Sequence, residues 1–177
     1  GIEIAKPGFI NIYFDITFWE NYLLKLIRLN SKFGINANPK KKYNIEFVSA
    51  NPTGPLHVGH CRGAVLGDTL SNLLIFNGNK VTKEYYVNDC GGQIDNFVSS
   101  VYYRILEITQ NKSFPYNENL YPGNYIIDIA NKIIKSKLIK NFSNLDKIYK
   151  KLSFLSLKYS MQLISANLNL LGVKHNN

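Results

Sequence analysis

Two histidines three residues apart, His57 and His60, are the side chains of this 177-residue sequence best suited to chemistry. They follow residues 51–55, which are rich in the turn-forming residues proline, glycine and asparagine. Where such a loop enters a helix, free backbone N–H groups and the positive end of the helix dipole bind anions. Two imidazole donors at this point suit the α-phosphate of ATP during nucleotidyl transfer. Gly59, between them, leaves room for a flat ligand against the backbone.

Zinc binding is the other chemistry that paired histidines suggest. Zinc metalloproteases place two histidines four residues apart on a helix, with a glutamate between them as the general base. His57 and His60 have the wrong spacing, and Gly59 cannot act as a base. His175 lies too near the end of the sequence to serve as a third ligand. We therefore expect no metal to be held by these side chains.

Parallel strands joined by a helix are the elements that would position these histidines. Residues 43–49 predict a strand that stops before Pro52, because proline cannot donate to a ladder. Apolar residues at helical spacing predict a helix over 58–76, and β-favouring residues predict a strand over 80–87. This order predicts a right-handed βαβ unit with parallel strands, and hence an α/β fold.

A polar, glycine-bearing loop follows the second predicted strand and leads into a helix expected from 94 to about 108. Ligands of parallel sheets bind beyond the carboxyl ends of the strands, so this loop and the histidines are expected at the same edge. Four loop residues are placed to line the pocket: Asn88, Asp89, Gly91 and Gln93.

The sequence from Glu46 to His60, EFVSANPTGPLHVGH, closely resembles the arginyl-tRNA synthetases of bacteria. Its last four residues resemble the HIGH signature of class I aminoacyl-tRNA synthetases, and residues 62–68 and 84–95 extend the likeness. The sequence departs from the family pattern at three small residues: Cys61, Cys90 and Gly92.

The resemblance implies a class I Rossmann-like catalytic domain, in its first half, that works on ATP, accompanied by Mg²⁺, and on L-arginine and tRNA(Arg). It implies that His57 and His60 stabilise the transition state at the α-phosphate. The residues that it assigns to ATP binding are Pro55, Leu56, His57, Gly59 and His60. Those that it assigns to arginine binding are Glu46, Ser49 and Asn51.

Several of these residues also have a purely structural explanation. A carboxylate such as Glu46 in an apolar strand is costly unless a cation pairs with it, yet a glutamate on an edge strand faces water without cost. Asn51 stands before a proline, where asparagine is an ordinary turn residue. Arg62 is expected either to meet a phosphate or to pair with Asp68.

We expect two units in the chain. Residues 1–35 resemble the end of the family's N-terminal additional domain, which contacts tRNA, followed by a connecting helix. Residues 36–177 are expected to hold the first half of the catalytic domain with a helical insertion, so that the sequence would be a fragment.

The N-terminal unit is expected to contain a strand after Pro7 and Gly8. Thr17 and Glu20 fit a capping box, which predicts a helix that starts there and ends near Gly34. Residues 36–42 are expected to be a linker.

Beyond the second loop, residues 109–124 predict an irregular connection, and helices are expected over 125–140 and 144–171. The last helix is expected to begin at a capping box from Ser143 to Asp146 and to end at Gly172.

The net charge of +9 arises mainly from lysine, and residues 132–158 contain eight lysines and one acid. Lys147, Lys150 and Lys151 would share one helix face. Such a face either contacts RNA or is simply solvated in a lysine-rich chain, and the sequence leaves both alternatives open.

No apolar run approaches the ~18 residues that span a membrane, so a cytoplasmic protein without membrane contact is expected. The two cysteines, Cys61 and Cys90, are expected to be small core or pocket thiols without a disulfide. The resemblance further implies a monomer for the full-length enzyme.

The family's KMSKS lysine loop, second half-sheet and anticodon-binding domain have no counterpart in this sequence, so crippled activity is expected of these residues alone. Two other functions stay open. One is that of a small HxGH nucleotidylyltransferase with a non-tRNA acceptor. The other is that of a tRNA- or partner-binding module without catalysis.

Overall fold

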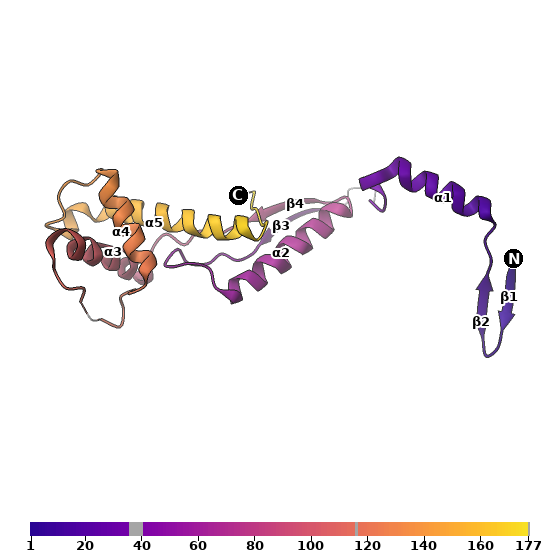
Figure 1. The fold of residues 1–177 in the computed structure, drawn as a ribbon, viewed down its shortest axis with the longest axis horizontal. Helices are drawn as coiled ribbons and strands as arrows, with labels where there is room; N and C mark the ends of the chain where they lie inside the picture. Colours follow the sequence, from indigo (N-terminus) through magenta and orange to yellow (C-terminus); the bar gives the residue numbers. More distant parts are fainter. Residues whose placement is uncertain (36–40, 116, 177) are drawn as a thin grey trace.

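The computed structural model describes residues 1–35, 41–115 and 117–176. In these ranges the strands are β1 (Ile2–Ala5), β2 (Phe9–Ile12), β3 (Lys42–Glu46) and β4 (Lys80–Glu84). The helices are α1 (Ile16–Leu29), the 3-10 turn η1 (Asn30–Lys32), α2 (Val58–Phe76), α3 (Gly92–Gln110), α4 (Asn124–Ser136) and α5 (Leu145–Leu170). Figure 1 shows β3, α2 and β4 in the middle and α3 and α4 at one end, with α5 reaching from that end to the middle.

The predicted βαβ unit is confirmed, since β3 and β4 pair in parallel with Ile45 opposite Lys83. Both strands are shorter than the sequence suggested. β3 ends at Glu46 because Val48 and Ser49 turn to φ values of 71° and 39°, outside the β region. The α/β fold with parallel strands and flanking helices agrees with expectation.

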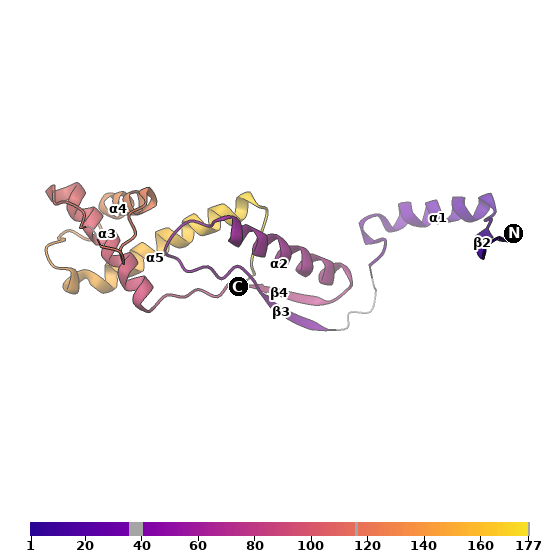
Figure 2. The ribbon, with the colours of Figure 1, turned by 90° about the horizontal axis from the view of Figure 1, so that it is seen from below.

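Helix α2 covers one face of this small sheet, as Figure 2 shows. Phe47 packs on α2 so closely that a Cβ built at Gly67 would come within 2.3 Å of its ring. From β4, the Lys83 ammonium pairs with the Asp68 carboxylate of α2 at 2.6 Å. Because side chains alternate along a strand, Asn44 and Glu46 occupy the opposite face.

The segment after α5 lies along β4, at the edge away from β3. The Asn176 N–H donates to the Lys83 carbonyl at 2.8 Å, and the Lys83 N–H donates to Asn176 Oδ1 at 2.9 Å. The His175 ring lies against Phe47 with 4.3 Å between ring centroids. These contacts fix the end of the described chain on the βαβ unit.

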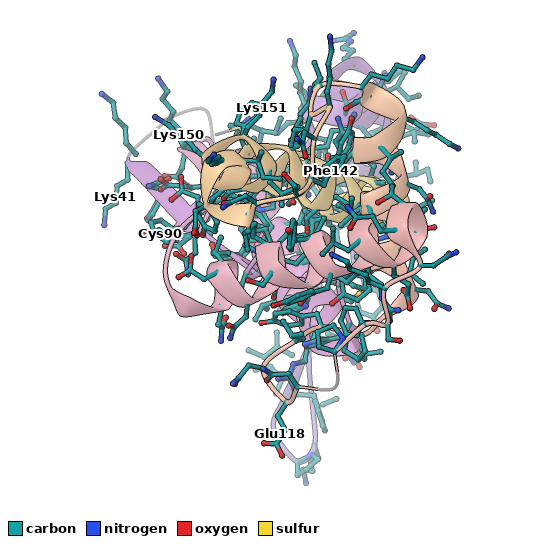
Figure 3. The ribbon with its side chains drawn as sticks, turned by 90° about the vertical axis from the view of Figure 1, so that its left-hand side faces the viewer. Lys41, Cys90, Glu118, Phe142, Lys150 and Lys151 are labelled. Carbon is teal, nitrogen blue, oxygen red and sulfur yellow. The ribbon has the colours of Figure 1, made fainter. Side chains whose placement is uncertain are left out.

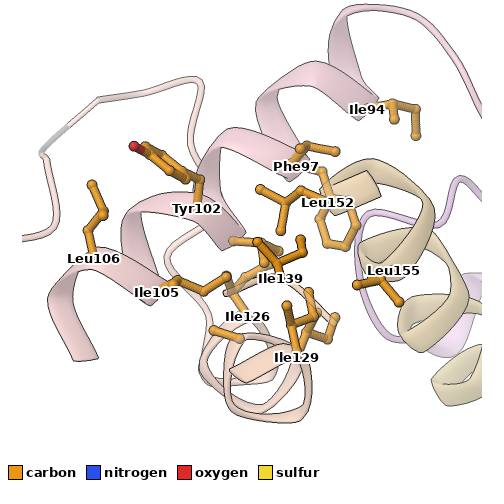
Figure 4. Close-up of a cluster of buried hydrophobic side chains, with 14 residues drawn as sticks. Ile94, Phe97, Tyr102, Ile105, Leu106, Ile126, Ile129, Ile139, Leu152 and Leu155 are labelled. Carbon is orange, nitrogen blue, oxygen red and sulfur yellow. The ribbon is translucent and has the colours of Figure 1, made fainter. Parts of the chain in front are cut away.

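The main hydrophobic core lies among α3, α4 and α5 (Figure 4). Phe97 of α3, Ile133 of α4 and Leu152 of α5 are fully buried in it. Further along α5, Ile164 and Leu168 join a second cluster with Phe47. Helix α5 therefore ties the helical bundle to the βαβ unit.

The N-terminal segment is a hairpin of β1 and β2 followed by α1, where the sequence predicted a strand and a helix. The predicted capping box of Thr17 and Glu20 is wrong. Asp15 is the N-cap instead, and its carboxylate accepts hydrogen bonds from the Thr17 N–H and hydroxyl. The boundary between the two expected units stays a prediction, and most of the expected linker, residues 36–40, lies outside the described residues.

The expected capping box at the start of α5 is also wrong. Asn144 caps this helix and accepts from the Lys147 N–H at 3.2 Å, so Ser143 lies outside the cap. Helix α4 ends before the predicted residue 140, because Lys137 adopts a left-handed φ of 55°. Gly172 follows α5 with φ 74°, as the expected helix end requires. In the described residues no helix is long and apolar enough to cross a membrane.

Candidate functional site

The two histidines form a reciprocal cap at the start of α2. His57 is the N-cap residue, and its Nδ1 accepts from the Gly59 N–H at 3.1 Å. His60 Nδ1 accepts from the His57 N–H at 3.3 Å. The rings are stacked with centroids 3.7 Å apart. Because each Nδ1 is an acceptor, the neutral rings carry their protons on Nε2, which is then free to donate to a ligand.

Gly59 lies close against the His57 ring. A Cβ at position 59 would lie 3.0 Å from Cε1 and 3.1 Å from Nδ1 of His57. A side chain at this position would therefore require the imidazole to shift by a few tenths of an ångström. That Gly59 also lets a flat ligand reach the backbone stays a prediction.

The pKa of His60 is lowered from its ordinary value, first by desolvation and second by the nearby charge of His57. A lowered pKa keeps His60 neutral near pH 7. A neutral imidazole keeps the tautomer that the cap requires, with Nδ1 accepting and Nε2 donating. The cap and the ring chemistry thus favour the same protonation state.

Three side-chain amides form a chain across the two loops at the carboxyl end of the sheet. Asn88 Nδ2 donates to Asn51 Oδ1 at 3.1 Å, and Asn51 Nδ2 donates to Gln93 Oε1 at 2.7 Å. Ser49 Oγ accepts from the Tyr86 N–H at 3.0 Å and ties the same loops together. The structure therefore brings Ser49, Asn51, Asn88 and Gln93 together, as expected for one edge of the sheet.

Glu46 lies at the last position of β3, opposite Glu84 in the register. Its side chain is exposed, so the desolvation cost expected for an apolar strand does not arise. The two carboxylates share a face of the sheet, and Asn44 donates to that of Glu84. A site for a cation between the two carboxylates would relieve their repulsion. The role of Glu46 in arginine binding stays a prediction.

Three residues distant in the sequence hold the loop between β3 and α2, and no sequence pattern predicted them. The Tyr85 hydroxyl donates to the Ala50 carbonyl and the Tyr125 hydroxyl to the Thr53 carbonyl, each at 2.8 Å. Asn167 Oδ1 of α5 accepts from the Leu56 N–H at 3.4 Å. The loop that leads into His57 is therefore anchored to α4, to α5 and to the residue that follows β4.

The other predicted residues take simple positions. Pro55 is exposed and Leu56 is half-buried beside the second core cluster. Gly91 caps α3 with φ 97°, which a residue with a side chain rarely adopts, and Asp89 is exposed in the loop before it.

Arg62 and the two cysteines lie outside this network. Asp68 pairs with Lys83, so the suggested pairing with Arg62 is wrong, and Arg62 lies on the exposed side of α2. Neither cysteine forms a disulfide; Cys61 is half-buried and Cys90 is exposed.

A cavity of about 380 Å³ opens between the segment after β4, helix α5 and the segment after α5. Tyr85, Val87, Met161 and His175 are among its lining residues, and none of the predicted site residues lines it. Within the described residues no group of three His, Cys, Asp or Glu side chains is placed to hold a metal ion.

A profile of the family described as "tRNA synthetases class I (R), catalytic domain" matches residues 23–168. The arginine–tRNA ligase of Pelagibacter ubique is 53% identical over 176 residues, which cover 98% of this chain and 30% of the relative. That of Ehrlichia ruminantium (strain Welgevonden) is 44% identical over 177 residues, again covering 98% and 30%. The chain thus spans 30% of the length of these curated relatives.

Comparison with solved structures also finds arginyl-tRNA synthetases. A protein of Campylobacter jejuni described as an arginyl-tRNA synthetase superposes with a TM-score of 0.83 at 33% identity, over 92% of this chain and 36% of that one. The arginyl-tRNA synthetase of Plasmodium falciparum, at 19% identity and a TM-score of 0.51, covers 99% and 32% and shows the fold alone. The expected class I catalytic fold is confirmed by these matches.

Proposed function

The chain belongs to the class I (R) tRNA synthetase family, and from this premise we propose that it forms the ATP- and arginine-binding part of an arginyl-tRNA synthetase. The whole protein would activate L-arginine with ATP and then transfer it to tRNA(Arg). In the first step an arginine carboxylate oxygen attacks the α-phosphorus, the bond to the bridging oxygen breaks, and pyrophosphate leaves.

The reciprocal cap of His57 and His60 is the observation that carries this proposal. Both Nδ1 atoms are held by backbone N–H groups, so both Nε2–H groups are available as oriented donors. Negative charge grows on the α-phosphate oxygens and the leaving pyrophosphate as the reaction proceeds. A preorganised donor at such a point typically contributes ~3–4 kcal/mol to transition-state stabilisation.

The negative charge of two carboxylates supports the proposed binding of the arginine side chain. Glu46 and Glu84 present two carboxylates on one face, and a guanidinium offers paired donors that match a carboxylate. Asn51, held by its two amide neighbours, would orient the arginine backbone groups. We propose these contacts for Glu46, Ser49 and Asn51, with Asn88, Asp89, Gly91 and Gln93 lining the pocket.

Magnesium is expected to arrive with ATP rather than in a protein cage. The described residues offer no cluster of three ligating side chains, and Mg²⁺ commonly binds through substrate phosphates and water. We further propose that the whole protein acts as a monomer in the cytoplasm, where tRNA charging serves translation.

A chimaera tests the proposal directly. Residues 1–177 would replace the matching segment of the Pelagibacter ubique arginine–tRNA ligase, which is 53% identical. We expect arginine to be attached to tRNA, and the His57→Asn variant, which keeps an N-cap acceptor, to lower kcat at least ~100-fold. Arginylation that survives in both His57→Asn and His60→Asn chimaeras at full rate would contradict the assigned roles.

Pyrophosphate exchange into ATP tests the chain alone, with each amino acid in turn and with or without total tRNA. We expect little or no exchange, because these residues supply only part of the site. Exchange that requires arginine would support the proposed substrate. Exchange with a different amino acid would refute the assignment of Glu46.

A further inference from the structure

Helix α5 carries a continuous basic stripe on its exposed side, which we define as Lys147, Lys150, Lys151, Phe154 and Lys158. Positions 147, 151, 154 and 158 follow the i, i+4, i+7, i+11 spacing of a single helix face. All five side chains are exposed, and Phe154 is 66% exposed. Figure 3 shows Lys150 and Lys151 on the side of α5 turned away from α3.

The stripe combines positive charge with an aromatic ring. Asp146 is the one acid of α5; it lies in the first turn, four residues before Lys150, at the edge of the stripe. Neither of the ion pairs found among the described residues uses a lysine of the stripe. A surface for single-stranded nucleic acid uses lysines for phosphates and an aromatic ring for a base, and the stripe offers both.

We propose that this stripe binds an RNA strand, with its lysines on consecutive phosphates and an unpaired base stacked on Phe154. The stripe is about 16 Å long at 1.5 Å per residue, so its four lysines can follow the backbone of a short strand. A membrane surface fits less well, because this face offers a single apolar side chain and the rest of the helix packs in the protein core.

The position of the stripe relates it to the candidate site. Tyr149, beside the stripe, donates a hydrogen bond to Asp95 of α3. Asp95 lies two residues after Gln93, which bonds Asn51. The part of α5 that carries the stripe is therefore tied to the start of α3, next to the candidate site. This inference rests on the proposed function for the identity of the RNA as tRNA, but the binding surface stands on its own geometry.

The test is fluorescence anisotropy of a labelled RNA stem–loop with a single-stranded 3′ extension, titrated with the whole chain at several salt concentrations. The test variant is Lys147→Gln/Lys150→Gln/Lys151→Gln. The control, Lys42→Gln/Lys80→Gln/Lys112→Gln, removes the same charge from exposed positions elsewhere. We expect the test variant to bind at least ~10-fold more weakly and its salt slope to fall by about 2, since each phosphate contact contributes about 0.7. The control should keep the slope.

Phe154→Ala and Phe154→Leu test the stacking. Both should weaken binding of the extended RNA at least ~5-fold with the salt slope unchanged, and neither should affect a blunt duplex. The inference is overturned if the chain binds no RNA, or if the two triple variants weaken binding equally. It is also overturned if Phe154→Ala changes nothing.

These outcomes are separate from the proposed function. RNA binding through the stripe without arginylation by the chimaera would sink the enzymatic proposal alone. Arginylation by a chimaera that carries the triple substitution at an unchanged KM for tRNA would sink the RNA surface alone. Far-ultraviolet circular dichroism confirms that each surface variant keeps its helices.

Discussion

The ring of Phe47 lies directly on Gly67, so that a Cβ at position 67 would meet the Cγ of Phe47 at 2.3 Å and its Cβ at 2.5 Å. Phe47 follows β3, and Gly67 lies in the middle of α2. This contact sets the distance between the sheet and the helix that carries His57 at its start. Phe47 takes no part in the proposed chemistry, but its packing on α2 helps to position the histidines at the start of that helix.

Gly67→Ala is expected to destabilise the chain. Alanine favours a helix over glycine by ~1 kcal/mol. The new Cβ would, however, overlap the ring and the Cβ of Phe47, and such overpacking costs about 1–3 kcal/mol. We expect a net loss in the free energy of unfolding, measured by urea denaturation with circular dichroism. Gly63→Ala is the matched control, since no atom lies within 4 Å of its new Cβ. It should stabilise by ~0.5–1 kcal/mol. Equal effects at both positions would contradict the close packing.

His60 is expected to titrate below its ordinary pKa. Desolvation lowers the pKa most, and the charge of His57 lowers it further. His57→Asn keeps a capping side chain and removes that charge, so it should raise the pKa of His60 only part of the way. Because the folded state binds this proton more weakly than the unfolded chain, stability is present above pH 6.5 and falls as the pH decreases through the folded pKa.

Proton NMR of the imidazole Cε1–H signals measures this pKa, and the sequence has only three histidines to assign. A midpoint for His60 at or above 6.5 would show that the ring is not desolvated. A midpoint unmoved by His57→Asn would show that the two rings do not interact.

The sequence predicted the start of α2 well because the signals there are local. A histidine at the N-cap, proline and glycine before it and apolar spacing after it all lie within one turn of the boundary. The helix caps elsewhere were harder, since Asp15 and Thr17 both suit an N-cap and only the structure shows which one accepts. The turn at Val48 was hidden, because a β-branched residue rarely adopts a positive φ.

The supports of the loop before His57 could not be predicted from the sequence. Tyr125 is 72 residues from Thr53, and Asn167 is 111 residues from Leu56. No periodicity links residues so far apart. For Glu46 the sequence left two alternatives, a carboxylate paired with a cation in an apolar strand or one that faces water, and the structure shows the side chain exposed.

Gln93→Met is expected to release the side chain of Asn51. Gln93 accepts a 2.7 Å hydrogen bond from Asn51, and methionine keeps the length while removing the acceptor. In a ¹⁵N–¹H spectrum of the whole chain, the side-chain NH₂ signals of Asn51 should move and exchange faster with water. Gln110→Met, at the end of α3, is the control and should leave these signals in place.

In the chimaera, Gln93→Met should raise the KM for arginine ~5-fold, as expected for one hydrogen bond worth ~1 kcal/mol, with kcat little changed. Unchanged Asn51 signals would show that Gln93 does not hold this amide. Changed signals with an unchanged KM would show that Asn51 does not contact arginine.

The raised pKa of Tyr149 predicts that the free energy of unfolding decreases in strong base. Burial raises its pKa to about 12, and the hydrogen bond to Asp95 with the charge of that carboxylate adds to the effect. The folded chain therefore holds this proton more tightly than the unfolded chain, whose tyrosines titrate near pH ~10. By linkage, the stabilisation is complete below pH ~10 and declines as the pH rises toward 12.

Tyr149→Phe should make the chain less stable at pH 8, where it removes the hydrogen bond between α5 and α3, and the deficit should shrink between pH 10 and 12. Urea denaturation at pH 8, 10 and 11.5 measures both effects. In Tyr149→Phe the free energy of unfolding should still depend on pH in this range, though less than in the parent chain. Desolvation also raises the pKa of Tyr85 and Tyr125, and these tyrosines remain. Tyr86→Phe, at an exposed tyrosine, is the control and should follow the parent chain at every pH. A constant deficit for Tyr149→Phe at all three pH values would show that the phenol and the Asp95 carboxylate are not coupled, and would leave the placement of the α5 stripe beside the site without its anchor.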